Sequence, residues 1–464
     1  MKKRFVVLVL AFVLTGTAVI TIELARKSYF YPTIPQPDFS PPGNRTEAWQ
    51  QDLDYFQNYI WLNRPYTDET RQDALFLVQR LRENIDELSD AELKLGIAEA
   101  VALSQNGHSF VRISDLTLSE GRIPIMGRMF DDGYYIMWTT PQYRHLLGGQ
   151  IVSIDGHSIE EVIKAFRPYS GAKESYFRMV VGWFLETPSL VHARGYANSP
   201  SSYRLGIRPM DSETVTEVVV SLDDASITPP VVNPSDMVAP IPMDRWHGLP
   251  SQLSSMPFFL QEWDEPFHYR VIESINGFYM RYGANNDVGE HSITSFNRAI
   301  KSELSQHAYS VIIVDQRSNN GGDYTRTYKL MTHLPELAGE HTPIYVITGP
   351  MSFSAGISSV AFLKASGGEQ VTIIGTEMGD HERMWGETSL LTLPNSQLDL
   401  QLATGLHDYA DGCYEFPNCY WLDFFVNVSV GSLSPEIVVP FTFEDYVFGE
   451  DAAINFILDT HGES

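Results

Sequence analysis

Short, wholly apolar runs alternate with amphipathic segments through the C-terminal part of the chain. The apolar runs are residues 310–315 (SVIIVD), 344–348 (IYVIT) and 371–375 (VTIIG). Segments with helical periodicity lie beside them, at residues 291–304, 324–334 and 354–366. Continuous apolar strands that alternate with helices are typical of a parallel sheet covered on both faces. The pattern therefore predicts an α/β core.

The pattern differs in the N-terminal half. Residues 47–103 have helical periodicity, and Ser89-Asp90-Ala91-Glu92 has the form of a capping box at a helix start. That helix is predicted to stop in a left-handed turn at Asn106-Gly107. Short β-like runs dominate residues 123–222. Within them, LLGGQIVSIDGHSIEEVIKAF predicts a glycine turn, a strand, an Asp-Gly turn and a helix.

The first 30 residues have the pattern of a targeting segment. Residues 5–22 form an almost purely apolar run behind a basic start, and no small-x-small cleavage site is evident. A helix of that length, at about 1.5 Å per residue, nearly spans the hydrocarbon core of a bilayer. We predict an uncleaved single-pass anchor, with a cleaved signal peptide as the alternative. Both place the remainder outside the cytoplasm, in the periplasm or the extracellular space.

Taken together, these patterns divide the chain into six segments. They are a signal anchor or signal peptide (1–30), a proline-rich spacer (31–46), an N-terminal helical region (47–118), a β-rich module (119–225), a connector (226–266) and the α/β core (267–464). A length of 464 residues agrees with two to three domains at roughly 100–200 residues each.

Composition narrows the possible partners. Acidic residues number 58 against 32 basic ones, a formal net charge of −26. Phosphate backbones would repel such a chain, so no nucleic-acid partner is predicted. The only cysteines, Cys413 and Cys419, exclude a four-cysteine zinc site, and export favours a disulfide between them over two free thiols. Histidines are scattered without metal-ligand spacing, so neither a metal nor another cofactor is predicted.

The candidate catalytic residues follow the ends of predicted strands. Ser354 follows IYVIT and the turn GPMSF and opens a helix, where the helix dipole and the N–H of Ala355 could stabilise an oxyanion. A serine there is also an ordinary N-cap, a role that Ser352 could equally take. Gly321 and Gly322 follow the preceding strand, and the N–H of either could be the second oxyanion donor. They also suit a plain turn before a helix.

A histidine for the same chemistry lies far upstream. His108 follows the predicted helix in the run NGHS, and a neutral imidazole is the usual general base for a serine nucleophile. A lone histidine is more often structural, so His108 is a candidate base only in combination with the other motifs.

Together these segments resemble the family of C-terminal-processing (tail-specific) serine peptidases, in its tricorn-like branch. VIIVDQRSNNGG is similar to the family's strand and Asp-Leu-Arg-x-Asn-x-Gly-Gly loop, with Gln316 in place of leucine. The segment around Ser354 is similar to the nucleophile segment, and NGHS to the Gly-His motif. LLGGQIVSIDGHSIEEV resembles the PDZ-like module, and LSPEIVVPFTFEDYVFGEDAAINFIL the C-terminal end. The resemblance implies a crotonase/ClpP-like α/β core with a mostly parallel sheet, an N-terminal helical region and a PDZ-like β-rich module.

Departures from the family leave two roles open. Bacterial processing proteases pair their serine with a later lysine, but the corresponding run GTEMGDHERMWGET has none and carries Asp380 and His381 instead. His381 is therefore the alternative base to His108. Glu387 is the first candidate for the acid that orients the base, with Asp408 and Asp423 as alternatives.

These features predict a serine-type peptidase that acts on peptides or proteins outside the cytoplasm through Ser354 and His108, as an endopeptidase or a tail-specific enzyme. The alternative is a catalytically inactive member of the family that serves as a peptide-binding or scaffold protein. An α/β-hydrolase ranks lower, because its Gly-x-Ser-x-Gly elbow is only half present at residues 352–356. A crotonase-type acyl-CoA enzyme lacks evident cationic phosphate contacts.

Overall fold

The computed structural model describes residues 26–222, 229–230, 232–233 and 236–462. The predicted anchor or signal peptide falls almost wholly on residues 1–25 and so lies outside the described residues. No helix within the described ranges is long and apolar enough to cross a membrane. Residues 26–30 are helical and lead into the remainder of the chain.

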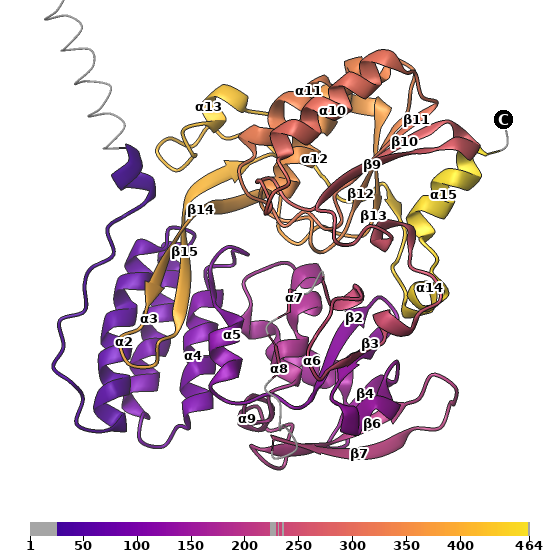
Figure 1. The fold of residues 1–464 in the computed structure, drawn as a ribbon. Helices are drawn as coiled ribbons and strands as arrows, with labels where there is room; N and C mark the ends of the chain where they lie inside the picture. Colours follow the sequence, from indigo (N-terminus) through magenta and orange to yellow (C-terminus); the bar gives the residue numbers. More distant parts are fainter. Residues whose placement is uncertain (1–25, 223–228, 231, 234–235, 463–464) are drawn as a thin grey trace, which may run out of the picture.

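A six-stranded sheet forms the centre of the C-terminal half (Figure 1). Its order is β16-β13-β12-β11-β10-β9, and all neighbours are parallel except the β9–β10 hairpin, which turns at Asn276. The strands are β9 (Phe267–Ile272), β10 (Gly277–Tyr282), β11 (Val311–Asp315), β12 (Ile344–Thr348), β13 (Val371–Gly375) and β16 (Ile437–Val438).

Both faces of this sheet are covered, as the continuous apolar runs predict. On one face, Ile312 and Val314 pack against three helices, α10 (Ile293–Gln306), α11 (Thr325–Ala338) and α12 (Ala355–Gly367). On the other, Val311 and Ile313 pack against α15 (Ala452–His461). Successive side chains of a strand point to opposite faces, so one short strand serves two apolar cores. The predicted α/β fold class is confirmed.

Three helices form the N-terminal region: α2 (Arg45–Leu62), α3 (Asp68–Glu83) and α4 (Asp90–Ala102). Ser89 and Glu92 cap α4 in the predicted capping box. The helix ends earlier than predicted, and the left-handed residue is Gln105, with a φ of 49°, rather than Asn106 or Gly107. The proline-rich segment lies along α2, since the Tyr55 hydroxyl donates to the carbonyl of Pro35 (2.6 Å).

A long hairpin leaves the core and descends onto these helices (Figure 1). Its strands, β14 (Arg383–Thr392) and β15 (Asp399–Asp408), form an antiparallel sheet with β1 (Phe110–Val111). Leu391, Leu400 and Leu402 belong to the same apolar core as the N-terminal helices. The segment 267–464, predicted as the α/β core, therefore includes a hairpin that packs elsewhere.

The β-rich module is an antiparallel sheet in the order β2-β3-β4-β6-β7. Its strands are β2 (Ile125–Phe130), β3 (Gly133–Thr139), β4 (Gln150–Ile154), β6 (Ser202–Arg208) and β7 (Thr216–Ser221), with β5 (His157–Ser158) beside β4 and β8 (His247–Gly248) beside β3. The predicted turn, strand, Asp-Gly turn and helix appear as β4, Asp155-Gly156, β5 and α6 (Ile159–Phe166).

A short helix, α5 (Ile113–Leu118), lies at the end of the predicted helical region. Three more short helices interrupt the described part of the chain that is predicted to be mainly β: α7 (Glu174–Val180), α8 (Gly182–Leu185) and α9 (Pro188–Ala193). Phe177, Phe184 and Leu190 bury their side chains in the core shared with α4, and this tertiary burial outweighs local preference. Towards the C-terminus, Cys413 and Cys419 form the predicted disulfide, followed by α13 (Asp423–Val426) and α14 (Phe443–Phe448).

Candidate active site

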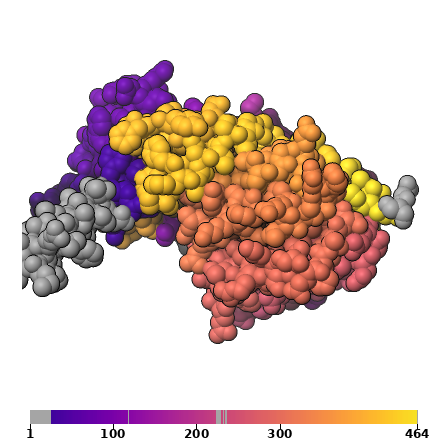
Figure 2. Space-filling view, turned by 90° about the horizontal axis from the view of Figure 1, so that it is seen from above, coloured from indigo at the N-terminus to yellow at the C-terminus, as the bar shows by residue number. Residues whose placement is uncertain are grey.

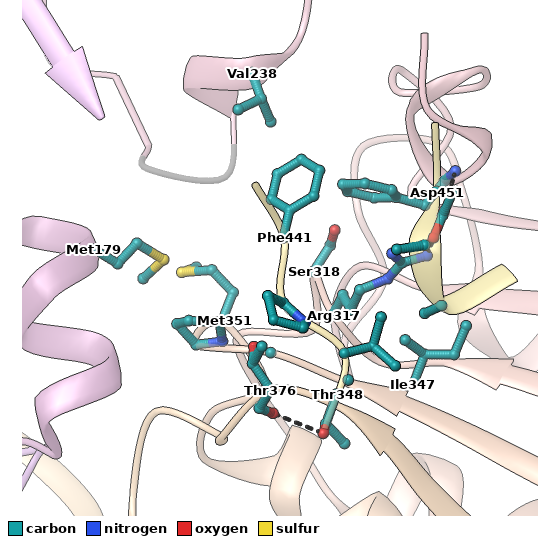
Figure 3. A pocket seen from close by; sticks show the side chains of 18 of the residues that line it. Met179, Val238, Arg317, Ser318, Ile347, Thr348, Met351, Thr376, Phe441 and Asp451 are labelled. Atoms are coloured by element: carbon teal, nitrogen blue, oxygen red, sulfur yellow. Dashed lines mark hydrogen bonds and ion pairs between the residues drawn. The ribbon is translucent and has the colours of Figure 1, made fainter. Parts of the chain in front are cut away.

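A buried ion network holds the loop after β11. Arg317 lies 2.7 Å from a carboxylate oxygen of Asp315 and 2.8 Å from one of Asp451. Burial alone would lower the pKa of the Arg317 guanidinium, but the two carboxylates outweigh it and raise this pKa. Figure 3 shows Arg317 beside Asp451 in the wall of a cavity of about 70 Å³, which Met351 and Phe441 also line. The network fixes the start of the loop in one orientation.

Hydrogen bonds join this loop to the turn that carries Ser354. The N–H of Phe353 donates to the carbonyl of Asn319 (3.0 Å), and the Ser352 hydroxyl donates to the carbonyl of Gln316 (2.8 Å). Ser352 is fully buried, and its oxygen also accepts from the N–H of Gly349 (3.1 Å). The Ser352 side chain thus stabilises the turn by these two hydrogen bonds, and Ser352 is not the N-cap of α12.

Ser354 is the residue before α12, and it adopts a φ of 53° and a ψ of −126°. A non-glycine residue at positive φ costs on the order of 1–3 kcal/mol, and such residues cluster at functional sites. Its side chain makes no capping hydrogen bond to the helix, so the ordinary N-cap role is not taken. A Cβ at Gly321, whose φ is 106°, would lie 2.5 Å from the Ser354 Cβ, so only glycine allows this approach.

Two backbone N–H groups beside Ser354 are available for an oxyanion. Gly321 is not one of them, because its N–H donates to Oδ1 of Asn319 (3.1 Å). Within the part of the chain that the structure describes, the N–H groups of Ala355 and Gly322 have no hydrogen-bond acceptor. Both residues line the same cavity as Ser354. Of the predicted donors, Ala355 and Gly322 therefore fit best.

His108 reaches this cavity from the N-terminal helical region. Its Nδ1 lies 3.0 Å from Oδ2 of Asp380, and both side chains are buried. Its Nε2 is buried without a hydrogen-bond partner among the described residues. The ring lies 4.6 Å from that of Phe353, the neighbour of Ser354. A Cβ at Gly107 would come within 2.6 Å of Oδ2 of Asp380, so glycine before the histidine makes room for the carboxylate.

A second histidine cluster faces the same cavity of about 340 Å³. Nδ1 of His407 lies 3.0 Å from Asp423, and Nε2 lies 3.6 Å from Glu387. Burial would lower the pKa of His407, but the two carboxylates outweigh it and raise this pKa to about 10. The ring is therefore a cation at neutral pH. The hydroxyl of Tyr31 also donates to Glu387.

None of the three predicted acids contacts His108. Glu387 and Asp423 are paired with His407, and Asp408 lies 2.6 Å from a guanidinium nitrogen of Arg383. The acid at His108 is Asp380, which the sequence placed beside His381 but did not single out. The one signal was its position, since it stands where the family's lysine would be expected.

His381, the alternative base, is exposed and does not line the cavity. Its backbone N–H donates to Oδ1 of Asp380 (2.9 Å), so it contributes to orienting that carboxylate through the main chain. Among the described residues, no group of three or more His, Cys, Asp or Glu side chains is arranged to hold a metal ion.

Comparisons with known proteins bear on the fold. No family model matches the chain, and no curated protein matches it. The structure is similar to that of mature CPAF, with a TM-score of 0.54 and 12% identity over 90% of this chain and 97% of that one. The complex of mature CPAF with lactacystin gives a TM-score of 0.54 and 11% identity over 90% and 98%.

The photosystem II D1 C-terminal processing protease also aligns, at 13% identity over 88% of this chain and 98% of that one, with a TM-score of 0.37. The chain is thus similar in fold to mature CPAF. At such identities the similarity concerns the fold alone.

Proposed function

We propose that the protein is a serine-type peptidase of the tricorn-like kind, which cleaves peptides or proteins outside the cytoplasm with a histidine base in place of a lysine. One observation carries the proposal: Ser354 is held at a positive φ, without a capping bond, in the cavity that His108 and Gly322 also line. The pairing of His108 with Asp380 supports the assignment of the base.

The mechanism follows from these contacts. With Nδ1–H donating to Asp380, Nε2 of His108 carries the lone pair and takes the proton from the Ser354 hydroxyl. The serine oxygen attacks the peptide carbonyl carbon, and the N–H groups of Ala355 and Gly322 hold the oxyanion. The imidazolium then returns the proton to the leaving amine, and water hydrolyses the acyl-enzyme in a second round. Loss of one oxyanion donor typically costs about 10²–10³ in rate.

Substrate and location follow the same reasoning. We infer that the PDZ-like module binds an extended peptide by adding it to an edge of its sheet. The Cys413–Cys419 disulfide supports an oxidising compartment outside the cytoplasm. The apolar run of residues 5–22 supports single-pass attachment to the membrane, and the cleaved signal peptide is the alternative.

A fluorophosphonate probe tests the proposal, because it reacts with an activated serine and spares an inactive one. We expect the probe on Ser354, located by peptide mapping, and loss of both labelling and peptide hydrolysis in Ser354→Ala with unchanged thermal unfolding. Ser358→Ala is the matched control, since Ser358 lines the same cavity with its hydroxyl 2.7 Å from that of Tyr409. A folded wild-type chain that resists the probe would favour the inactive, peptide-binding or scaffold alternative.

A further inference from the structure

Four large aromatic side chains stand exposed in one short stretch of the chain. They are Tyr414, Phe416, Phe424 and Phe425, with 75%, 84%, 47% and 75% of their surface exposed. We call these four residues the aromatic rim. Exposed apolar groups scattered singly need no explanation, but a cluster marks a surface that meets another apolar phase.

A disulfide and a hydrogen bond hold the segment that carries the aromatic rim. Tyr414 and Phe416 lie in the loop that the Cys413–Cys419 disulfide closes, and Phe424 and Phe425 lie on α13. The N–H of Cys413 donates to the Asn427 side chain (2.8 Å), which joins the loop to the end of α13. The rings are therefore presented to the outside by a fixed framework.

The chain enters the folded part beside this rim. The guanidinium of Arg26 lies 3.6 Å from the ring centroid of Trp421, whose ring in turn lies 5.9 Å from that of Phe425. The ring of Phe30 lies 5.2 Å from that of Tyr420. Both views place the first described residues against the segment that carries the rim (Figures 1 and 2).

The apolar run that precedes Arg26 indicates what covers the rim. This run ends at residue 22, and four residues of chain reach at most about 14 Å. A bilayer that holds the run must therefore lie close to Trp421 and the rim. Trp and Tyr side chains are enriched at the boundary between water and lipid, Phe side chains bury their rings in it, and the cation of exposed Lys27 complements lipid phosphates.

We propose that the aromatic rim docks the folded part of the protein onto the lipid headgroup region of the membrane in which residues 5–22 are anchored. Within the disulfide loop, residues 413–419, Glu415 is the one acidic residue. Its carboxylate lies 2.7 Å from the guanidinium of Arg383, so the negative charge that would face lipid phosphates is partly compensated. The inference rests on the proposed anchor and not on the peptidase assignment.

Docking in this way fixes where the active site works. Tyr31 lines the cavity of Ser354 and follows Arg26 by only five residues. The cavity therefore lies near the membrane surface. This second consequence rests on the proposed peptidase activity as well: the substrates are segments of polypeptide close to the bilayer.

Photochemical cross-linking of the full chain in vesicles of phosphatidylcholine and phosphatidylglycerol tests the inference. Phe416 or Phe425 is replaced by photoreactive benzoylphenylalanine, and Phe448 on α14, which is 67% exposed, is the matched control. We expect lipid adducts at positions 416 and 425, in at least about tenfold excess over position 448, by mass spectrometry of the peptides.

Three results would overturn the docking surface: adducts to residues 1–25 of the same chain, adducts to a second copy of the chain, or equal lipid yields at all three positions. Flotation with the vesicles separates this failure from that of the anchor, because a chain that does not float refutes the anchor and the docking together. Fluorophosphonate labelling of the same samples reports the peptidase assignment independently.

Discussion

Two buried histidines face one cavity, and they differ in how many carboxylates hold them. His108 has one, Asp380 on Nδ1, and its Nε2 has no partner among the described residues. His407 lies between two, Asp423 and Glu387. One carboxylate orients the ring and leaves Nε2 open to accept a proton, whereas two raise the pKa of His407 to about 10 and so hold that ring as a cation at neutral pH. On this view, the number of carboxylates separates the proposed base, His108, from a structural cation, His407.

Replacing the proposed base gives the largest expected effect. His108→Gln removes the proton acceptor, so we expect kcat/KM for a peptide substrate to fall by about 10⁴–10⁶. His381→Gln is the matched control, because that exposed side chain lies outside the cavity and should change kcat/KM less than twofold. The reverse ranking of the two variants would make His381 the base.

The two carboxylates offer a second test of the same contrast. Asp380→Asn keeps the shape but loses the charge that orients His108 and stabilises its imidazolium, so kcat should fall by about 10²–10⁴. Asp423→Asn makes the same change at His407 and should lower kcat less than about tenfold. Steady-state kinetics of the two variants, with folding verified by circular dichroism, measures the difference. Equal losses would show that both clusters take part in the proton transfer.

The cationic state of His407 predicts how stability depends on pH. Its pKa is raised from 6.5 to about 10 in the folded protein, so the stabilisation is fully present below about pH 6.5 and is lost as the pH rises through 10. We expect the free energy of unfolding to fall by a few kcal/mol over this interval, at about 1.4 kcal/mol per pKa unit. Urea unfolding at several pH values measures it, and Asp423→Asn should flatten the dependence. An unchanged slope in that variant would assign the alkaline loss to other groups.

These clusters also mark how far the sequence could predict the site. Apolar runs and turn residues located the strands, the helix behind Ser354 and the glycines of the β11 loop, because these features are local. The choice between Asp380, Glu387, Asp408 and Asp423 is tertiary, since it depends on where the β14–β15 hairpin leaves the core. The same hairpin brings Glu387 and His407 together across its two strands, and no sequence spacing encodes that pairing. The helices at 174–193 were missed for a similar reason, because their apolar faces are explained only by the core they join.

The smallest expected effect concerns Tyr31, whose side chain lines the cavity beside Glu387 and His407. Burial and the neighbouring Glu387 raise the pKa of Tyr31, so its hydroxyl stays protonated and holds the N-terminal segment at the cavity. A hydrogen bond to a charged group contributes about 1.5–3 kcal/mol to stability. The loss on removing it is smaller at a partly exposed site, because water can take the place of the missing hydroxyl. Tyr31→Phe keeps the ring but removes the bond to Glu387, while Thr404 and Arg64 still hold the carbonyls of Phe30 and Tyr29. Access to the cavity should therefore loosen locally, and the rate of fluorophosphonate labelling should rise by about two- to tenfold. Tyr29→Phe alters the same segment two residues earlier, outside the cavity lining, and should leave the rate unchanged. A rate that falls in Tyr31→Phe would instead make the Tyr31–Glu387 bond part of the working site, and Glu387 would then belong with the catalytic cluster rather than with the structural one.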